Sequence, residues 1–369
     1  MHYRSAGRLR CSRGRPDRKE LAGAAGPNYN RAVNLFCRRR LLILLPGLLF
    51  LAWSRIGAEP RSWLARGTAR VAVPAGYVPG QAREVTFATE EYNLKLYSSR
   101  FAQGELVYVE LTAVGDSSIE ESQLFLDALP VPLEPSSFGM RGLFALAPTL
   151  PAGTHNMILV RGDSRQTHEL SVQATDFPVY RSQLDLGSFS DQTRTYTPEQ
   201  LAFIRTCSAH KAAAFGRRTA LALVGRFSHP RDEHRVTSPF YSTRFVERYR
   251  VRNGVRQALE PTRNVHQGLD LRGLTGAPIF ALADGTIALA ENMFFEGNLT
   301  VIDHGQGIFS VYMHQSELLV QPGEHVEAGQ LIGRTGATGM VTGPHLHISV
   351  YVRGISADPL SMLVLPVRD

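Results

Sequence analysis

Cysteine is scarce in this chain of 369 residues, which has three. Cys11 and Cys37 lie in or before a basic N-terminal segment, so the remainder of the chain contains only Cys207. A single cysteine cannot form an internal disulfide, which excludes a small fold that depends on disulfide bridges. Residues 226–365 contain no cysteine for a structural zinc site of the usual kind. From Leu221 onward the chain also lacks a dinucleotide glycine motif and a phosphate-binding loop.

Outside the N-terminal segment the chain has no excess of positive charge. The formal net charge is +7, but residues 1–58 contain 12 of the 40 Lys and Arg and two of the 33 acidic residues. The rest of the chain therefore has 28 basic and 31 acidic residues, a net charge of −3. A nucleic-acid-binding domain needs a basic patch on its folded surface. Nucleic acid is therefore not predicted as a partner.

A hydrophobic run long enough to span a membrane is also missing. Leu41–Trp53 is a run of thirteen apolar residues, broken only by Pro46-Gly47, that follows three arginines. As a helix it would be about 20 Å long, which is shorter than the roughly 30 Å hydrocarbon core. This pattern predicts a signal peptide with a cleavage site near Ile56-Gly57-Ala58, and a start nearer Val33 would give it an ordinary length. We expect export to the periplasm or cell envelope; an uncleaved anchor that tethers the chain to the inner membrane is the alternative. Membrane contact is expected only through this leader.

Two β-rich regions follow the leader. Alternating runs such as Glu105–Leu111 and His155–Val160, separated by turn residues, predict an immunoglobulin-like β-sandwich. Thr197 before Pro198 predicts a helix start, because threonine caps helices and proline suits their first position. The fold class is mainly β: the sandwich, a short helical linker, and a compact antiparallel β-sheet domain. The predicted segments are a leader at 1–58, a linker at 59–83, the sandwich at 84–176, a linker at 177–225 with a helix at about 198–215, and the second domain at 226–365.

Residues 342–350 read Thr-Gly-Pro-His-Leu-His-Ile-Ser-Val, with two histidines in an apolar alternation. On an extended strand His345 and His347 share one face, and Leu346 and Ile348 share the other, which predicts a core face. Two imidazoles in a half-buried strand are costly unless they have a use. Taken alone, a pair of ordinary surface histidines explains the stretch equally well.

A second short motif supplies partners for this pair. In Val265–Asp270, an extended backbone places His266, Gly268 and Asp270 on one face, and the glycine leaves room for an ion. This motif is weak alone. Joined to the histidine pair it predicts a Zn²⁺ site with two imidazoles and one carboxylate, which leaves the fourth tetrahedral position for water.

The same domain has more histidines than such a site needs. His314 follows Tyr312-Met313, and alternation predicts that His314 and Tyr312 share a strand face. Cleavage of an amide requires one group to take a proton from water and another to stabilise the oxyanion or to protonate the leaving amine. We expect His345 and His314 to fill these roles.

Residues of about 261–361 resemble the lysostaphin-type zinc peptidases, family M23, also called the LytM domain. The pieces that carry the resemblance are His266-Gln-Gly-Leu-Asp270, Gly297-Asn-Leu-Thr-Val-Ile-Asp-His-Gly305, Tyr312-Met-His314, Val326-Glu-Ala-Gly-Gln-Leu-Ile-Gly333 and Thr338-Gly-Met-Val-Thr-Gly-Pro-His-Leu-His347. By the pattern of this family, His266, Asp270 and His347 resemble the ligands of one zinc ion per chain. His314 and His345 resemble the catalytic histidines.

The resemblance implies an exported metallo-endopeptidase that hydrolyses the peptide cross-links of bacterial peptidoglycan, with the stem peptides as its partners. Two alternatives remain: an inactive LytM-type regulator that activates a cell-wall amidase, and a wall-binding module. A protein regulator of the wall machinery is a further candidate partner. Where relatives often have Ser-x-Phe-Gly-x-Arg, this chain has Tyr241 in place of the glycine, which changes the rim of the site. Tyr241 and Tyr312 are predicted to contact substrate.

Overall fold

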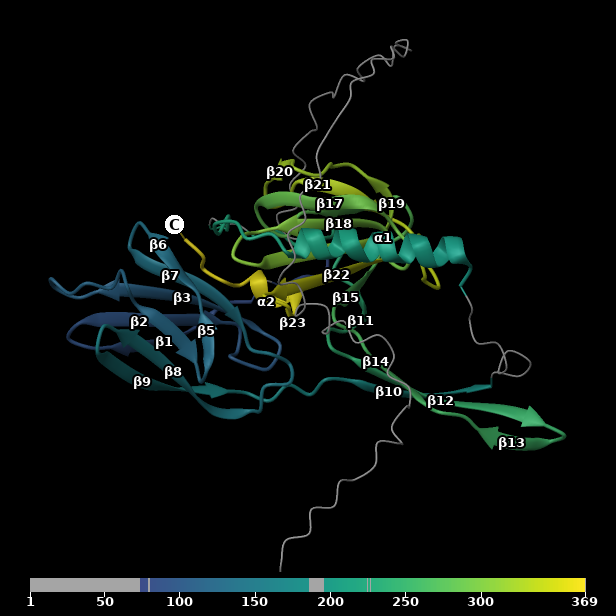
Figure 1. Ribbon diagram of the computed structural model, residues 1–369, viewed down its shortest axis with the longest axis horizontal. Helices are drawn as coiled ribbons and strands as arrows, with labels where there is room; N and C mark the ends of the chain where they lie inside the picture. The colour runs from purple at the N-terminus through teal and green to yellow at the C-terminus, as the bar shows by residue number, and fades with distance from the viewer. Residues whose placement is uncertain (1–73, 79, 186–195, 224, 226, 369) are drawn as a thin grey trace, which may run out of the picture. The chain divides into compact units, whose positions relative to one another are not determined.

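The computed structural model describes residues 74–368 except 79, 186–195, 224 and 226 (Figure 1). The predicted leader and most of the first predicted linker therefore lie outside the described residues. In the described part of the chain the fold is mostly β-strand, as predicted, with two helices. No helix in that part is long and apolar enough to cross a membrane.

The first β-rich region consists of two antiparallel sheets. Their inward residues, such as Leu94 and Val109 of one sheet and Leu124 and Leu159 of the other, form one buried cluster. This shared core makes the region a β-sandwich, and its immunoglobulin-like type stays a prediction. The sheets are, in order, β1 (Arg83–Ala88), β2 (Tyr92–Ser98), β3 (Leu106–Ala113), β7 (Gly139–Ala145) and β6 (Leu133–Ser136), and then β5 (Leu129–Val131), β4 (Gln123–Leu126), β8 (Gly153–Arg161) and β9 (Ser164–Val172).

The predicted helix is present as α1, Pro198–Phe215. Its start has both halves of a capping box: the Thr197 hydroxyl accepts from the Gln200 N–H, and the Gln200 side chain accepts from the Thr197 N–H. These bonds satisfy two donors that a helix start would otherwise leave without partners. Cys207 and Ala214 of α1 belong to one buried cluster with strand residues such as Leu289, Val301 and Phe309, so the helix packs on the sheet that these strands form.

A small sheet forms next to the predicted linker. The strand β10 (Val179–Asp185) falls inside the region expected to be a linker, and it pairs in parallel with β12 (Thr243–Arg252). The sequence of β10 lacks the alternation of apolar and polar residues that predicts a strand, because none of its side chains is buried. The strand forms through backbone pairing with β12. The sheet is completed by β13 (Val255–Ala258) and β14 (Thr262–Val265), both antiparallel to β12.

The ten-stranded sheet carries the candidate site. Alternation places Leu346 and Ile348 in one buried cluster, as predicted, and leaves His345 and His347 on the opposite face of their strand. The order is β11 (Val236–Ser238), β15 (Leu269–Arg272), β22 (His345–Val352), β19 (Ile308–Leu318), β18 (Gly297–Asp303), β17 (Gly285–Met293) and β20 (His325–Val326), with β16 (Pro278–Phe280), β21 (Leu331–Thr335) and β23 (Ile355–Ala357) paired at its margins and α2 (Pro359–Met362) following.

Candidate metal centre

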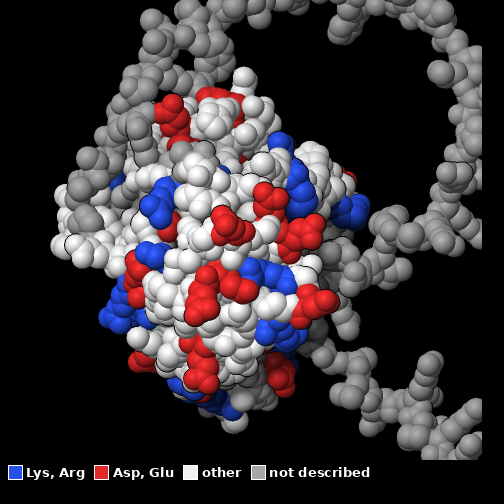
Figure 2. Space-filling view, turned by 90° about the vertical axis from the view of Figure 1, so that its left-hand side faces the viewer, with Lys and Arg blue, Asp and Glu red and all other residues white. Residues whose placement is uncertain are grey.

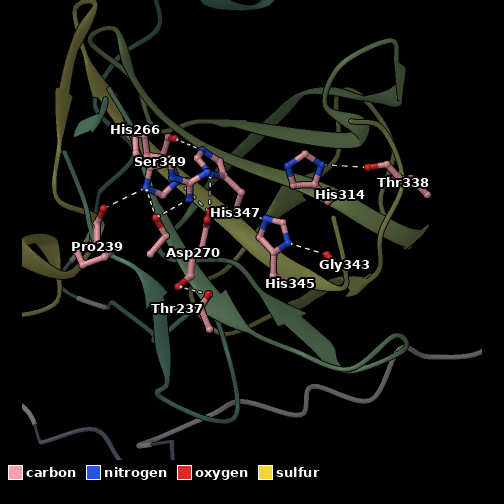
Figure 3. A network of polar contacts seen from close by, with 12 residues as sticks. Thr237, Pro239, His266, Asp270, His314, Thr338, Gly343, His345, His347 and Ser349 are labelled. Carbon is pink, nitrogen blue, oxygen red and sulfur yellow. Dashed lines mark hydrogen bonds and ion pairs between the residues drawn. The ribbon is translucent and has the colours of Figure 1, made fainter. Parts of the chain in front are cut away.

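Two neighbouring strands and the segment before one of them bring three predicted ligands together (Figure 3). In the antiparallel pair of β15 and β22, Asp270 lies directly opposite His347. His266 comes from the segment between β14 and β15. Its Nε2 atom is 3.0 Å from Asp270 Oδ1 and 3.0 Å from His347 Nδ1, and the His347 Nδ1 atom is 2.9 Å from the same carboxylate oxygen.

These three atoms form a compact triangle that suits a small metal ion. Zinc binds histidine nitrogen and carboxylate oxygen at about 2.0–2.2 Å, so an ion above the triangle can contact all three atoms. Among the described residues, His266, Asp270 and His347 form the one group of three such side chains that could hold a metal. Without cysteine in the set, three protein ligands leave one tetrahedral position open.

The two ligand imidazoles are held in defined orientations by hydrogen bonds on their other nitrogen atoms. His266 Nδ1 lies 3.0 Å from the carbonyl oxygen of Pro239, to which it donates, and Nε2 remains available to the ion. His347 is oriented the opposite way: its Nε2 atom is 2.9 Å from Ser349 Oγ, and Nδ1 points to the ligand triangle. Such partners fix the tautomer of a ligand histidine and raise its basicity. Ser349 and Pro239 were not assigned roles from the sequence, although alternation places Ser349 on the face of His347.

Gly268 makes room for the ligand set, but not in the way the sequence suggested. A Cβ atom at this position would lie 2.4 Å from Ser349 Oγ and 2.5 Å from His347 Nε2. Side-chain atoms do not approach one another so closely. The missing side chain therefore makes space for the His347 imidazole and its serine partner, rather than for the ion itself.

The electrostatic environment keeps two of the ligands, Asp270 and His347, in their metal-binding forms. Burial by itself raises the pKa of Asp270, but its close contacts with His266 and His347 outweigh burial and hold this pKa well below its usual range. Burial lowers the pKa of His347, despite its hydrogen bond to Asp270. At neutral pH Asp270 is thus a carboxylate and His347 a neutral imidazole, which are the forms that bind a divalent metal.

Two further histidines face the ligand triangle, as predicted for the groups that act on water (Figure 3). The His345 ring lies 5.0 Å from the His314 ring, and His345 Nε2 is 3.7 Å from Asp270 Oδ1. Each ring uses Nδ1 to bond a backbone carbonyl: His345 bonds Gly343 at 2.9 Å, and His314 bonds Thr338 at 3.0 Å. In their neutral forms both rings therefore turn an unprotonated Nε2 toward the site.

His314 reaches the site because its strand is irregular. Its φ angle is +64°, in the left-handed region that non-glycine residues rarely adopt, and its N–H donates to the carbonyl oxygen of Glu296 at 2.9 Å. The register between β18 and β19 shifts at this point, since Asn298 pairs with Gln315 whereas Thr300 pairs with Tyr312. This β-bulge turns His314 toward His345. Burial lowers the pKa of His314 to about 4.

The same irregularity separates His314 from Tyr312, which corrects the prediction that they share a face. Tyr312 pairs with Ile348 and is fully buried in the core on the other side of the sheet. Its hydroxyl accepts from the Leu282 N–H at 2.8 Å. A side chain with no exposed surface cannot contact substrate, so the role predicted for Tyr312 is wrong in this conformation.

Tyr241 lies beside the metal ligands. Its N–H donates to the carbonyl oxygen of His266 at 2.8 Å, and its ring packs at 4.8 Å from that of Phe177. Its φ angle of +56° lies in the region that glycine adopts without strain. This backbone conformation explains how a glycine can occupy the same position in similar sequences. A substrate contact by the Tyr241 ring stays a prediction.

The fold and the site together define a mostly-β domain with a three-ligand metal centre and two accessory histidines. Residues 264–359 match the model of peptidase family M23, a segment that contains all five of these side chains. This part of the chain is an M23 domain of the LytM type.

Several curated proteins are similar to this segment. The chain is 43% identical over 89 residues to "Peptidoglycan DD-endopeptidase ShyA" of Vibrio cholerae, a match that covers 24% of this chain and 21% of the relative. It is 36% identical over 108 residues to "DD-carboxypeptidase/endopeptidase Mpg" of Neisseria meningitidis, covering 29% and 25%. The chain thus spans about a quarter or less of the length of these two relatives.

Two solved structures are similar to this chain, one over most of its length and one over about a quarter of it. A crystal structure described as peptidase M23 from Pseudomonas aeruginosa is 23% identical, with a TM-score of 0.48, and the match covers 72% of this chain and 96% of the other. The catalytic domain of lysostaphin from Staphylococcus simulans is 33% identical, with a TM-score of 0.26, covering 27% and 79%.

Proposed function

We propose that this protein is an exported zinc metallo-endopeptidase that hydrolyses peptide cross-links of bacterial peptidoglycan. The observation that carries the proposal is the convergence of three ligand atoms within 3.0 Å of one another, with the imidazoles of His345 and His314 facing them. The substrate class is supported by the similar proteins named as peptidoglycan DD-endopeptidases.

One zinc ion per chain, held by His266, Asp270 and His347, would supply Lewis acidity toward water and toward the scissile carbonyl. His345 acts as the general base. Its Nδ1–H is held by Gly343, so the free Nε2 can take a proton from the attacking water. His314 presents a free Nε2 in the same way. Since a neutral ring cannot donate from that atom, His314 steadies an oxyanion or protonates the leaving amine only after it has taken up a proton.

The two alternative functions predict different behaviour of the same side chains. A regulator that activates an amidase has no need for a base beside a metal, and a wall-binding module needs neither. Here the ligand imidazoles are oriented by Pro239 and Ser349, and both accessory histidines are oriented by backbone carbonyls. Such orientation of groups that act on water favours catalysis over the two alternatives.

Export rests on the leader. We propose that residues 1–58 direct the chain to the periplasm or cell envelope and are then removed, because the apolar run of thirteen residues is shorter than a membrane span. The alternative is that they stay attached as an anchor. The mass of the chain isolated from the envelope separates the two outcomes.

The activity is tested with the purified chain, zinc and isolated peptidoglycan sacculi, with the soluble products analysed by mass spectrometry. We expect cross-linked dimers to be converted to monomers. A chelator should abolish the conversion, and His345→Ala should reduce it by about 10²–10⁴-fold while it retains one equivalent of zinc, since a base contributes about this much. Unchanged cross-links with zinc bound would contradict the proposal and favour a regulator.

A further inference from the structure

The backbone of His314 depends on the turn between β17 and β18. This turn consists of residues 294–296, and the carbonyl oxygen of Glu296 accepts the His314 N–H at 2.9 Å. The bond lies at the β-bulge, where His314 has its positive φ angle. A non-glycine residue keeps such a conformation only where the surrounding structure imposes it. The position of the Glu296 carbonyl therefore affects the direction in which the His314 imidazole points.

The same turn also contacts the loop between β21 and β22. The carbonyl oxygen of Phe295 accepts the Met340 N–H at 2.9 Å. A Cβ atom at Gly339 would lie 2.5 Å from the Phe295 carbonyl oxygen, so the loop and the turn meet backbone against backbone. The two carbonyls that bond Nδ1 of the accessory histidines belong to this loop (Figure 3). The turn thus supports the accessory histidines from two directions.

Helix α1 contacts this turn through an ion pair. The Glu296 carboxylate accepts a hydrogen bond from the ammonium group of Lys211, which lies on α1. Each of these two side chains has only 11% of its surface exposed. Beside the ion pair, the ring of Phe203 from α1 lies 6.2 Å from the ring of Phe294 in the turn, in an edge-on arrangement. The turn is therefore fixed to α1 by one charged contact and one aromatic contact.

Burial distinguishes this ion pair from the charges at the surface. On the face shown in Figure 2, basic and acidic side chains are interspersed in contact with solvent. Exposed ion pairs contribute little, because water and salt screen them. A buried carboxylate that is separated from its cation is costly, so Lys211 and Glu296 hold each other in one place.

The metal ligands are supported by other parts of the chain. His266 and His347 are oriented by Pro239 and Ser349, neither of which belongs to the turn or to α1. Helix α1 also lies outside the segment 264–359 that matches the M23 family model. The ion pair therefore connects a side chain from outside that segment to the backbone of His314, and zinc binding does not depend on it.

We propose that Lys211 and Glu296 are positioning residues for the hydrolysis. Their ion pair fixes the turn on α1, and the turn fixes His314 through the bond to its N–H, which keeps the imidazole directed at the metal centre. This inference rests on the proposed function, because that function gives His314 its role in the reaction.

The test compares three variants of the full chain with the wild type. Lys211→Met removes the ion pair, and Lys211→Met/Glu296→Gln removes it without leaving a buried carboxylate unpaired. The control His210→Ala removes a half-exposed contact of 2.5 Å between α1 and Glu291 of β17, close to the turn. Hydrolysis of a soluble cross-linked peptidoglycan dimer gives kcat and KM, and bound zinc is counted in each protein.

A further measurement reports on the hydrogen bond itself, without reference to activity. In protein labelled with ¹⁵N-histidine, NMR follows the hydrogen exchange of the His314 amide, which donates to Glu296. The amide of the fully buried His304, which donates to the carbonyl oxygen of Ile308 at 2.9 Å, serves as the internal reference. Exchange rates report local opening of the structure, so the two amides separate a local effect at the turn from a general loss of stability.

We expect kcat of the double variant to fall about 10–100-fold, since misplacement of a reacting group by about 1 Å costs up to about 10²-fold. KM and the one equivalent of zinc should be unchanged. Its His314 amide should exchange about tenfold faster relative to His304. Its free energy of unfolding should be close to that of the wild type, because no buried charge lacks a partner. Lys211→Met should show the same loss of kcat, and His210→Ala should behave as the wild type.

Three outcomes would overturn the inference. They are a kcat that recovers together with stability in the double variant, a His314 amide whose exchange relative to His304 is unchanged, and an equal loss of kcat in His210→Ala. Failure of the proposed function is distinct: the wild type would then leave the soluble dimer intact, whereas faster exchange of the His314 amide in the double variant would still be measured.

Discussion

Replacing Gly268 with alanine should weaken zinc binding without greatly destabilising the fold. The added Cβ would lie 2.4 Å from Ser349 Oγ and 2.5 Å from His347 Nε2, whereas an ordinary contact begins at 3.4 Å. His347 must therefore retreat by about 1 Å or lose its hydrogen bond to Ser349. Loss of such a supporting bond typically costs 10–100-fold in metal affinity, which is about 1.4–2.7 kcal/mol.

The assay is competition for zinc between the metal-free protein and a chromogenic chelator. Gly343→Ala is the matched control, because nothing lies within 4 Å of a Cβ atom built there and its φ angle is not in the left-handed region. Ser349→Ala removes the hydrogen bond without adding bulk, so we expect a loss of about tenfold, near the lower end of the same range. Zinc affinity of Gly268→Ala within twofold of the wild type would refute the assignment of this glycine to the ligand set.

Two further predictions concern stability. Burial lowers the pKa of His229 from 6.5 to about 4, so the stability that its neutral form contributes is complete above pH 6.5 and is lost, by up to about 3 kcal/mol, as the pH falls toward 4. The free energy of unfolding, measured with urea at several pH values, should fall less steeply with decreasing pH in His229→Gln than in the wild type. An unchanged pH dependence would contradict the assignment of this loss to His229. Lys211 of α1 forms a buried ion pair with Glu296. Lys211→Met should therefore lower the free energy of unfolding by about 3–5 kcal/mol, because it leaves the buried Glu296 carboxylate without this cation. Adding Glu296→Gln should restore most of that loss, and additive losses in the double-mutant cycle would argue against a direct pair.

Strand alternation, a local property, was enough to find four of the five polar side chains of the candidate site from sequence, those of His266, Asp270, His345 and His347. His314 was found from its residue type and the family resemblance, because alternation places it on the wrong face. The period of two that places Leu346 and Ile348 in the core necessarily places His345 and His347 together on the other face. The helix at residues 198–215 was equally local, since its capping box and proline lie within four consecutive residues. The family resemblance then associated Asp270 with His347, which the structure shows as directly opposed residues on neighbouring strands.

Structural features that depend on pairing between distant segments could not be predicted from local sequence patterns. Whether His314 and Tyr312 share a face depends on the bulge where β19 meets β18, and the local sequence alone shows only regular alternation. The strand β10 exists through its partner β12, more than fifty residues further along the chain. The sequence by itself therefore determined which side chains could form the site, since residue type and alternation are local. Only the tertiary structure decided which nitrogen of His266 and of His314 faces the site, because their carbonyl partners, Pro239 and Thr338, lie 27 and 24 residues away along the chain.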